Sequence, residues 1–477
     1  EERGGTLKLR SNRRKSVPRR ISLSAGGAVD RSGHEFWFIP GKFGFCLACG
    51  DQPVAQARER NKVAGLTAEG RSSATTTLVT GMLEALNAPE SEVPRDKRKT
   101  LGFTDNRQDA ALQAGHFNDT VFVSLLRGAI LRAVIDAGEE GLDDEAFGRA
   151  VQKALGFAPQ HEESRHYWML NPEVKGSARD QAGRSLAKVL AHRVWADQRR
   201  GWRFTYPNLT ALDLIRPEFA GLAELLDELP DRSDAPSLFR ALARDQQEKG
   251  LRIILETMLE GLAVDAEALD ADTIESAAQR SRSLLTPPWA LDASEELRKR
   301  TALVLEAPPR RQTSKRDAIT LLRGGFRSGL GRKLNRPSVL GQRLRGEDFD
   351  ALVAFLLNLL EEFGIVGSVT PSLDLSGWQL SAAAVRLCPG PAVASPEVAQ
   401  NPFFHDLYAG IARDLKAGTP PIAGFEAREH TAQVSQQHRE WREWRFRATP
   451  EDEARVADAR ADIQAAGEKT TFLPTLF

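Results

Sequence analysis

The stretch Thr100-Leu-Gly-Phe-Thr-Asp-Asn-Arg-Gln-Asp-Ala-Ala-Leu-Gln-Ala-Gly-His-Phe-Asn-Asp119 decides the fold class. Its first five residues are typical of a buried strand, and Asp105 is a suitable N-cap for the helical pattern that runs from Asn106 to about Ala137. A strand followed directly by a capped helix is the repeating unit of α/β proteins. The sequence therefore predicts a parallel sheet flanked by helices.

Polar side chains follow this predicted strand. In an open parallel sheet the strands end at the edge where ligands bind, and the amides at a helix N-terminus favour phosphate there. Thr104, Asn106 and Arg107 would add side-chain donors at this point. Two interpretations are open from the residues alone: a junction that contacts phosphate, or an ordinary capped helix with Arg107 in solvent.

A second strand–helix junction is predicted between residues 428 and 447. Glu429-His430-Thr431 is typical of a strand end, and Ser435 is a suitable cap for the helix that follows. Arg439 on the first turn could bind phosphate, whereas Trp441 and Trp444 at three-residue spacing favour packing over base stacking. The candidate nucleic-acid contacts from the two junctions are Thr104, Asn106, Arg107, His430, Thr431 and Arg439.

Length and composition set the limits. A chain of 477 residues is expected to form about two to four domains. The formal net charge is zero, so any signal for nucleic acid must be local. Three cysteines exclude a disulfide scaffold and predict a cytoplasmic protein. No apolar run approaches the roughly 20 residues that span a bilayer, so no membrane partner is expected.

The middle of the chain predicts a mostly helical region. Helical patterns cover residues 143–155, 178–199, 211–228, 237–264 and 272–283. The segment Arg310–Arg345 is rich in glycine and arginine and contains one acid, Asp317. A helix over 347–363 precedes two short strands near 364–369 and 377–381, which predicts a winged helix near residues 345–388. Residues 473–477 are expected to form a buried strand.

Two motifs bear on metals and nucleotides. Cys46-x-x-Cys49 has the spacing with which two thiolates grip one Zn²⁺, although a pair of buried thiols is the alternative. Cys388 is isolated, so the remaining zinc ligands are expected before Glu1. No P-loop string is present, and the acidic strings that begin at Asp143 and Glu451 fit helix starts. We predict no catalytic residue here and no ATP hydrolysis by this chain alone.

Several stretches resemble a family of very large bacterial superfamily 2 (DEAD/DEAH-box) helicases. Residues 103–119 look like the start of the family's second RecA-like domain, the motif IV region. The segment 428–447 resembles its next conserved segment, and Leu473-Pro-Thr-Leu-Phe477 resembles the strand that leads into motif V. Further similar stretches are Phe45–Gly50, Gly70–Thr75, Arg200–Leu209, Pro287–Leu291 and Asn401–Phe404.

The resemblance implies a fold, an organisation and a function. Residues 1–95 would be a linker and Cys-x-x-Cys region, and 96–140 with 420–477 part of a RecA-like domain. Residues 141–419 would be a helical insertion. The chain ends in an apolar run and starts at Glu1, so we expect an internal piece of a longer helicase. That protein would use ATP and Mg²⁺, bound mainly by its other domains, to translocate on nucleic acid, with DNA favoured over RNA.

Two alternatives come from different classes of protein. The first is a non-enzymatic nucleic-acid-binding module with a zinc knuckle and a winged helix. The second is a helical interaction scaffold with an incidental α/β region. Salt-sensitive nucleic-acid binding would separate the scaffold from the other two, and ATP-dependent unwinding would identify the helicase.

Overall fold

A computed structural model describes most of the chain. The described residues are 2–3, 6–7, 17–24, 28–30, 33–40, 68–88, 90–104, 107–199, 206–291, 301–306, 320–372, 375–393, 395, 398, 402–418 and 421–477. The predicted site residues Cys46, Cys49 and Asn106 lie outside them. The chain divides into two units, residues 1–67 and 68–477. In the described part, no helix is long and apolar enough to cross a membrane.

The first unit contains two antiparallel strand pairs. Short strands β1 (Glu2–Arg3) and β2 (Thr6–Leu7) pair with each other. Strand β3 (Arg19–Leu23) pairs with β4 (His34–Phe38). All five residues of β4 are exposed.

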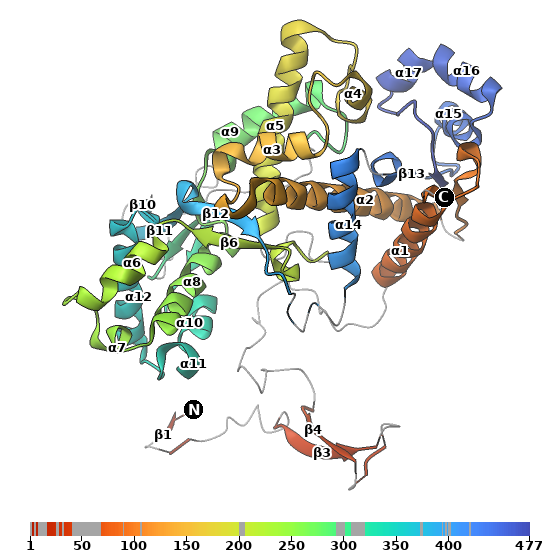
Figure 1. The fold of residues 1–477 in the computed structure, drawn as a ribbon. Helices are drawn as coiled ribbons and strands as arrows, with labels where there is room; N and C mark the ends of the chain where they lie inside the picture. The colour runs from red at the N-terminus through yellow and green to blue at the C-terminus, as the bar shows by residue number, and fades with distance from the viewer. Residues whose placement is uncertain are drawn as a thin grey trace. The chain divides into compact units, whose positions relative to one another are not determined.

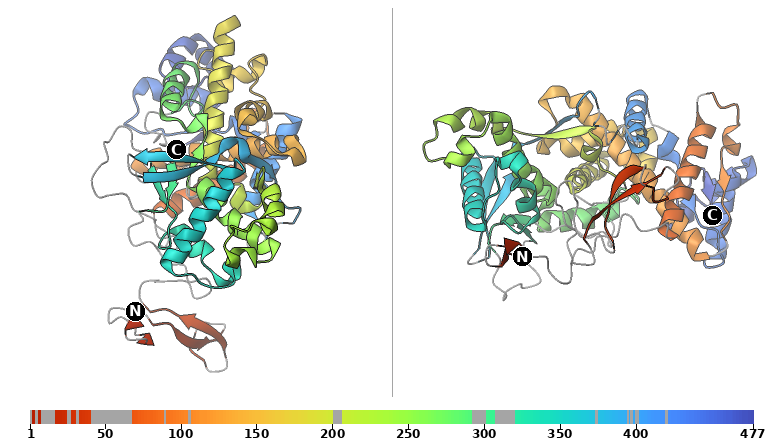
Figure 2. Two further views of the ribbon diagram at one scale, coloured as in Figure 1. Left: turned by 90° about the vertical axis from the view of Figure 1, so that its left-hand side faces the viewer. Right: turned by 90° about the horizontal axis from the view of Figure 1, so that it is seen from below.

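The second unit contains the predicted parallel sheet. Its strands are β5 (Thr100–Leu101), β13 (Ala427–Arg428) and β14 (Thr475–Leu476), in the order β13-β14-β5. Both pairings are parallel, with Thr475 opposite Thr100 and Ala427. The α/β class and the strand at the chain end are thus confirmed, although β5 is shorter than the predicted five residues. Figures 1 and 2 show the C-terminus beside the segment that contains α1 and β5.

Helix α2 (Arg107–Ala137) links this sheet to the helical region. Residues 120–131 of α2 are all buried, because α14 (Phe403–Ala417) and α3 (Asp144–Ala154) pack against it along with α1 (Ala68–Asn87). A side chain at Gly128 would overlap Ile411 of α14, so glycine allows the two helices to approach closely. The long helix predicted from residue 106 to about 137 is confirmed.

Further helices agree with the sequence patterns. They are α5 (Gly176–Gln198), α9 (Ala271–Leu284) and α12 (Gly346–Glu362). Helix α8 (Arg244–Glu260) covers only part of the predicted 237–264 helix, and α4 (Glu162–Trp168) was not predicted. The acidic string at Asp143 does cap a helix: its carboxylate accepts a hydrogen bond from the amide of Ala146 at 3.0 Å. The string at Glu451 falls in the first turn of α16 (Pro450–Asp458).

The prediction of a helix over 211–228 was wrong in its first half. Strand β6 (Ile215–Phe219) pairs there with β12 (Val385–Pro389), and helix α6 covers only Leu222–Glu228. Within β6 the residues alternate between buried and less buried, the period of a strand. Pro217 interrupts any helix, and the partner strand lies far away in sequence, so local periodicity was misleading.

A mixed sheet follows in the region predicted as a winged helix. Antiparallel strands β10 (Val366–Ser372) and β11 (Leu375–Ser381) come directly after α12, as expected. Strand β11 also pairs with β8 (Thr301–Val304) and β7 (Val264–Asp265), and β8 pairs in parallel with β9 (Thr320–Arg323). Short helices α7 (Ser237–Arg240), α10 (Gly329–Leu334) and α11 (Pro337–Leu340) complete this region.

Between β13 and β14 the chain forms three helices: α15 (Gln436–Arg447), α16 and α17 (Arg460–Ala465). Trp441, Val456 and Ile463 form a small separate core where they meet. Trp441 therefore packs, as its spacing from Trp444 favoured. Lys99, just before β5, donates hydrogen bonds to the carbonyls of Phe446 and Arg447 at 2.8 and 3.0 Å, so α15 ends beside the start of β5.

Candidate nucleic-acid interface

The junction after β5 is open to solvent. Gly102 lies against the ring of Phe477, and a side chain at this position would overlap that ring. Phe103 is 89% exposed, and Thr104 and Arg107 are exposed as well, with Arg107 the first residue of α2. An aromatic ring, a hydroxyl and a guanidinium are thus presented together within six residues of chain. Phe103 was not among the residues singled out from the sequence.

The junction after β13 is more tightly built. The backbone amide of His430 donates to the carbonyl of Phe477 at 2.6 Å, so the strand pairing continues past β13. The His430 ring Nε2 lies 2.8 Å from a carboxylate oxygen of Glu443 on α15. Thr431 is buried, and its hydroxyl has no hydrogen-bond partner among the residues that the structure describes. His430 thus joins the strand end to α15, while Thr431 retains unused hydrogen-bonding capacity.

The arginines of α15 divide into two kinds. Arg442 and Arg445 are buried and pair with Glu468 at 2.7 and 3.3 Å, and Arg447 pairs with Asp452 at 2.9 Å. In residues 436–447, all of which the structure describes, Arg439 is the one arginine without an acidic partner. Its Nε is buried and makes no hydrogen bond. The structure therefore separates Arg439 from arginines that hold the helix in place.

A buried ion cluster fixes α15 on the sheet. Glu426, next to β13, accepts from Arg445 at 2.5 Å and from Arg428 at 2.7 Å. Burial alone would raise the pKa of Glu426, but the charges of Arg445, Lys469 and Arg428 hold it well below its ordinary value. Glu426 is therefore ionised at neutral pH and anchors the helix that carries Arg439.

The two junctions lie at the same edge of the sheet. Because β13, β14 and β5 are parallel, the residues after Arg428 and after Leu101 leave from the same ends of their strands, with β14 between them. Thr104 follows β5, and His430 and Thr431 follow β13, at this edge, while Arg107 and Arg439 lie in the first turns of the helices that come next. The sixth candidate contact, Asn106, lies outside the described residues.

Two residues of the 100–119 stretch have structural roles that the sequence analysis did not assign. The Asn118 amide donates to the carbonyl of Ala427 and accepts from its backbone N–H, both at 2.8 Å. His116 lies 2.8 Å from the hydroxyl of Thr76 on α1 and 3.2 Å from that of Tyr206. Burial lowers the pKa of His116, so its neutral form is favoured. For both Asn118 and His116, the feature of the sequence that could have indicated a structural role is a polar residue within a helix predicted to be largely buried.

Other stretches that resemble the helicase family also converge on α2. Arg127 of α2 is fully buried, pairs with Asp197 of α5 at 2.8 Å and donates to the carbonyls of Tyr206 and Pro207. The Tyr206 ring in turn packs edge-on against Phe404. These residues stabilise the helical region, and their positions give no indication of contact with a ligand.

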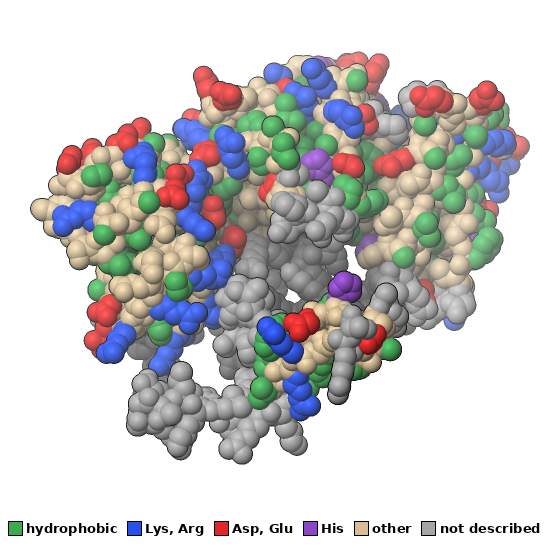
Figure 3. Space-filling view, turned by 60° about the horizontal axis from the view of Figure 1, so that its bottom comes forward, with side chains coloured by type: hydrophobic (Ala, Val, Ile, Leu, Met, Phe, Trp, Pro, Cys, Tyr) green, Lys and Arg blue, Asp and Glu red, His purple; other side chains and the backbone are tan. Residues whose placement is uncertain are grey.

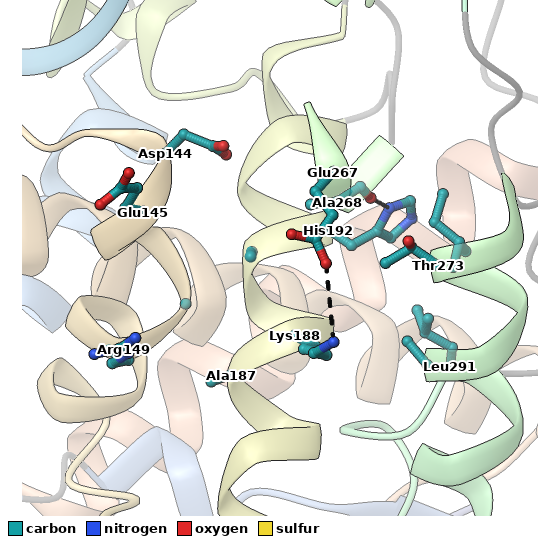
Figure 4. A pocket seen from close by; sticks show the side chains of 14 residues that line it. Asp144, Glu145, Arg149, Ala187, Lys188, His192, Glu267, Ala268, Thr273 and Leu291 are labelled. Atoms are coloured by element: carbon teal, nitrogen blue, oxygen red, sulfur yellow. Dashed lines mark hydrogen bonds and ion pairs between the residues drawn. The ribbon is translucent and has the colours of Figure 1, made fainter. Parts of the chain in front are cut away.

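A pocket of about 290 Å³ lies away from this edge, between α3, α5 and α9. Figure 4 shows Asp144 and Glu145 on one side, Thr273 on the other, and Lys188 and His192 of α5 between them. The His192 Nδ1 lies 3.0 Å from the carbonyl of Ala268, and Lys188 faces Glu267 at 4.0 Å. No residue predicted to contact nucleic acid lines this pocket.

The fit of a metal ion can be assessed only in the described part of the chain. There, no group of three or more His, Cys, Asp or Glu side chains could hold a metal ion. Cys388 is a buried free cysteine, and burial raises the pKa of its thiol, which disfavours the thiolate that metals bind. Cys46 and Cys49 lie outside the described residues.

In comparisons with known proteins, no family model, no curated protein and no solved structure matches the chain.

Proposed function

We propose that the chain provides part of the second RecA-like domain of an ATP-dependent superfamily 2 helicase or translocase. In this proposal the carboxyl edge of the β13-β14-β5 sheet is one wall of the nucleic-acid track. The observation that carries it is the parallel pairing of Thr100 with Thr475, 375 residues apart, which unites two helicase-like segments in one sheet.

The chemistry of the edge supports contacts with a phosphate backbone. Arg107 is exposed at the start of the 31-residue helix α2. Arg439 lies in the first turn of α15 and has no acidic partner among the described residues. Thr104 adds an exposed side chain at the first junction, whereas the Thr431 hydroxyl at the second junction is buried. Such groups recognise phosphate and sugar and not base identity, as a motor that moves along any sequence requires. DNA is the favoured nucleic acid.

ATP and Mg²⁺ belong to the proposal as cofactors of the whole helicase. The sequence has no P-loop, so they would be held mainly by domains other than the one described here. Zinc at Cys46 and Cys49 is a further part of the proposal. Replacing both cysteines by serine should abolish the zinc content measured in the purified protein, and unchanged zinc would refute this assignment.

Single-strand binding tests the proposed track. Arg107→Ala and Arg439→Ala should each weaken binding to a fluorescent oligothymidylate and reduce the slope of log K against log salt by about 0.7 unit. Arg447→Ala is the matched control: it removes the same charge from α15, but next to Lys99 at the opposite edge of the sheet. If all three variants bind like the unmodified chain, the track does not follow this edge.

The second candidate is a nucleic-acid-binding module without motor activity, carrying a winged helix. The order α12, β10, β11, with β8 paired to β11, supports a winged-helix arrangement near residues 345–388. The two candidates differ in one measurement on the complete protein. Nucleic-acid-stimulated ATP hydrolysis with strand separation supports the helicase, and binding without either supports the module.

A further inference from the structure

The region proposed as a winged helix has an uneven charge distribution. Residues 320–345, all of which the structure describes, contain no acid. They contain seven bases: Arg323, Arg327, Arg332, Lys333, Arg336, Arg343 and Arg345. Figure 3 shows Lys and Arg side chains at the left of the view, with Asp and Glu side chains among them. A local positive field therefore exists on a chain whose net charge is zero.

Four of these arginines are available for an external ligand. Arg323, Arg327, Arg343 and Arg345 are exposed, and none has an ion pair or side-chain hydrogen bond among the described residues. Lys333, in contrast, pairs with Glu260 at 3.0 Å, and Arg336 donates to the carbonyl of Arg332 at 2.9 Å. Exposed arginines without an ion pair are well suited to phosphate, which a guanidinium can bind through two parallel hydrogen bonds.

An exposed aromatic ring lies among them. Phe326 is 38% exposed, precedes Arg327 in the chain, and its ring lies 3.6 Å from where a side chain at Gly346 would begin, next to Arg345. The ring packs edge-on against the buried Phe349, and the backbone amide of Phe326 donates to Asp350 at 2.7 Å. The ring therefore packs against Phe349 and close to Gly346, with Arg327 next to Phe326 in the chain and Arg345 next to Gly346.

The helix and hairpin that a winged helix would normally present to nucleic acid, α12 and β10–β11, lack basic side chains. Helix α12 contains no Lys or Arg: Glu347, Asp348 and Asp350 lie in its first turns, next to Arg345, and Glu361 and Glu362 lie at its C-terminal end. Strands β10 and β11 also contain no Lys or Arg. An acidic helix followed by an uncharged hairpin would repel a phosphate backbone or leave it without a partner.

We propose that single-stranded nucleic acid binds this module on the β9–α10 side, with Arg327 and Arg345 on the phosphates and a base stacked on Phe326, and not on α12 or the β10–β11 hairpin. The proposal rests on the proposed function, in that it extends the same nucleic-acid track to a second surface. A single strand is favoured over a duplex because a stacking ring needs an unpaired base.

Binding of oligothymidylate to the whole 477-residue chain tests the charged part. Arg327→Ala combined with Arg345→Ala should lower the affinity by about tenfold or more and reduce the salt slope by about 1.4 units, since each lost phosphate contact on a single strand accounts for about 0.7. Arg184→Ala combined with Arg280→Ala is the matched control, because these arginines of α5 and α9 are exposed and have no ion pair within the described part of the chain. The control should bind like the unmodified chain.

An oligonucleotide with abasic sites tests the stacking. Phe326→Leu keeps an apolar side chain against Phe349 and removes the ring. It should weaken binding to oligothymidylate at least about fivefold and leave binding to the abasic strand unchanged. A variant that weakens both strands equally would contradict stacking. Unchanged thermal melting of each variant shows that the fold is kept. Arg323→Ala combined with Arg343→Ala provides a second variant that removes charge from the same surface.

The outcomes separate this proposal from the broader one. If Arg107→Ala and Arg439→Ala weaken binding while the Arg327 and Arg345 variants do not, the β9–α10 surface is not part of the track, although the helicase proposal stands. If none of these variants has an effect, both proposals fail. If the arginine surface instead binds phosphatidylserine vesicles and not oligonucleotide, its partner is a membrane and the inference is overturned.

Discussion

The side chain of Asn118 pairs with the backbone of Ala427 in the way that a neighbouring strand would. Its amide nitrogen donates to the Ala427 carbonyl, and its amide oxygen accepts from the Ala427 N–H, both at 2.8 Å. Ala427 is fully buried at the outer strand of the β13-β14-β5 sheet. Helix α2 thus closes the sheet edge, and one residue fixes the strand that leads to His430 and Thr431.

Asn118→Ala should destabilise the chain by about 2–4 kcal/mol, because two buried backbone groups lose their partners. Asn118→Asp should not restore stability, since a carboxylate cannot donate to the Ala427 carbonyl. Urea unfolding followed by circular dichroism measures both effects. Asn87→Ala serves as the control because Asn87 bonds only within its own helix, to Leu83, and should cost less than about 1 kcal/mol. Equal costs at the two positions would contradict the edge-closing role.

The ion cluster under α15 predicts a dependence of stability on acid. Glu426 has an ordinary pKa of 4.5, lowered in the folded chain against the opposing effect of burial. Its contribution is therefore complete above about pH 4.5 and is lost as the pH falls toward the folded-state pKa. Glu426→Gln should cost about 3–5 kcal/mol at pH 7, and the difference from the unmodified chain should narrow below pH 4.5.

Unfolding by urea at several pH values between 7 and 3 measures this difference. Glu451→Gln is a suitable control, because Glu451 forms an exposed pair with Arg455 and should change stability by less than about 1 kcal/mol at any pH. A difference for Glu426→Gln that stays constant across this range would show that the carboxylate charge is not what anchors α15.

The sequence was most informative where local signals and burial agreed. An apolar run followed by a cap and a helical pattern predicted β5 with α2, and the apolar run 473–477 predicted the buried strand β14, because neither prediction needs knowledge of a partner strand. The β6–β12 pairing was missed, since Ile215 and Val385 are 170 residues apart and the strand period of β6 is only five residues long. Nonlocal pairing of short strands leaves almost no trace in one sequence.

The candidate interface shows a similar limit. Arg439, Arg442, Arg445 and Arg447 look alike in the sequence, and only the positions of Glu468 and Asp452 separate the anchoring arginines from Arg439. Phe103 could have been recognised only with knowledge that β5 ends at Leu101, because a longer strand would have buried it. Whether an arginine anchors its helix or is available to a ligand therefore depends on which acidic side chains lie beside it in the folded chain.

Gly102 is expected to be sensitive to any side chain. A Cβ at this position would overlap the ring of Phe477, which is itself only 8% exposed and cannot move freely. Gly102→Ala should therefore cost about 1–3 kcal/mol, as overpacking usually does, and should displace the adjoining Phe103 and Thr104. Adding Phe477→Leu should recover part of the lost stability. If thermal melting shows the single and double variants to be equally unstable, the overlap is not the cause.

The buried pair of Arg127 and Asp197 gives the largest expected effect on stability. Both side chains are fully buried, and Arg127 also donates to the Tyr206 and Pro207 carbonyls, so one guanidinium joins α2, α5 and the 206–209 segment. Arg127→Met would leave the Asp197 carboxylate buried without a counter-charge. We expect a loss of about 3–5 kcal/mol, the cost of removing one partner from a buried ion pair.

A double variant separates the cost of the orphaned charge from that of the lost contacts. Arg127→Met combined with Asp197→Leu should be more stable than Arg127→Met alone, because no unpaired charge remains buried, yet less stable than the unmodified chain, because the Tyr206 and Pro207 carbonyls still lack their donor. Asp136→Asn breaks a more exposed pair with Arg132 on the same helix and should cost about 1 kcal/mol or less. Urea unfolding of the four proteins measures these differences, and a double variant less stable than Arg127→Met would mean that packing and not charge dominates at this position.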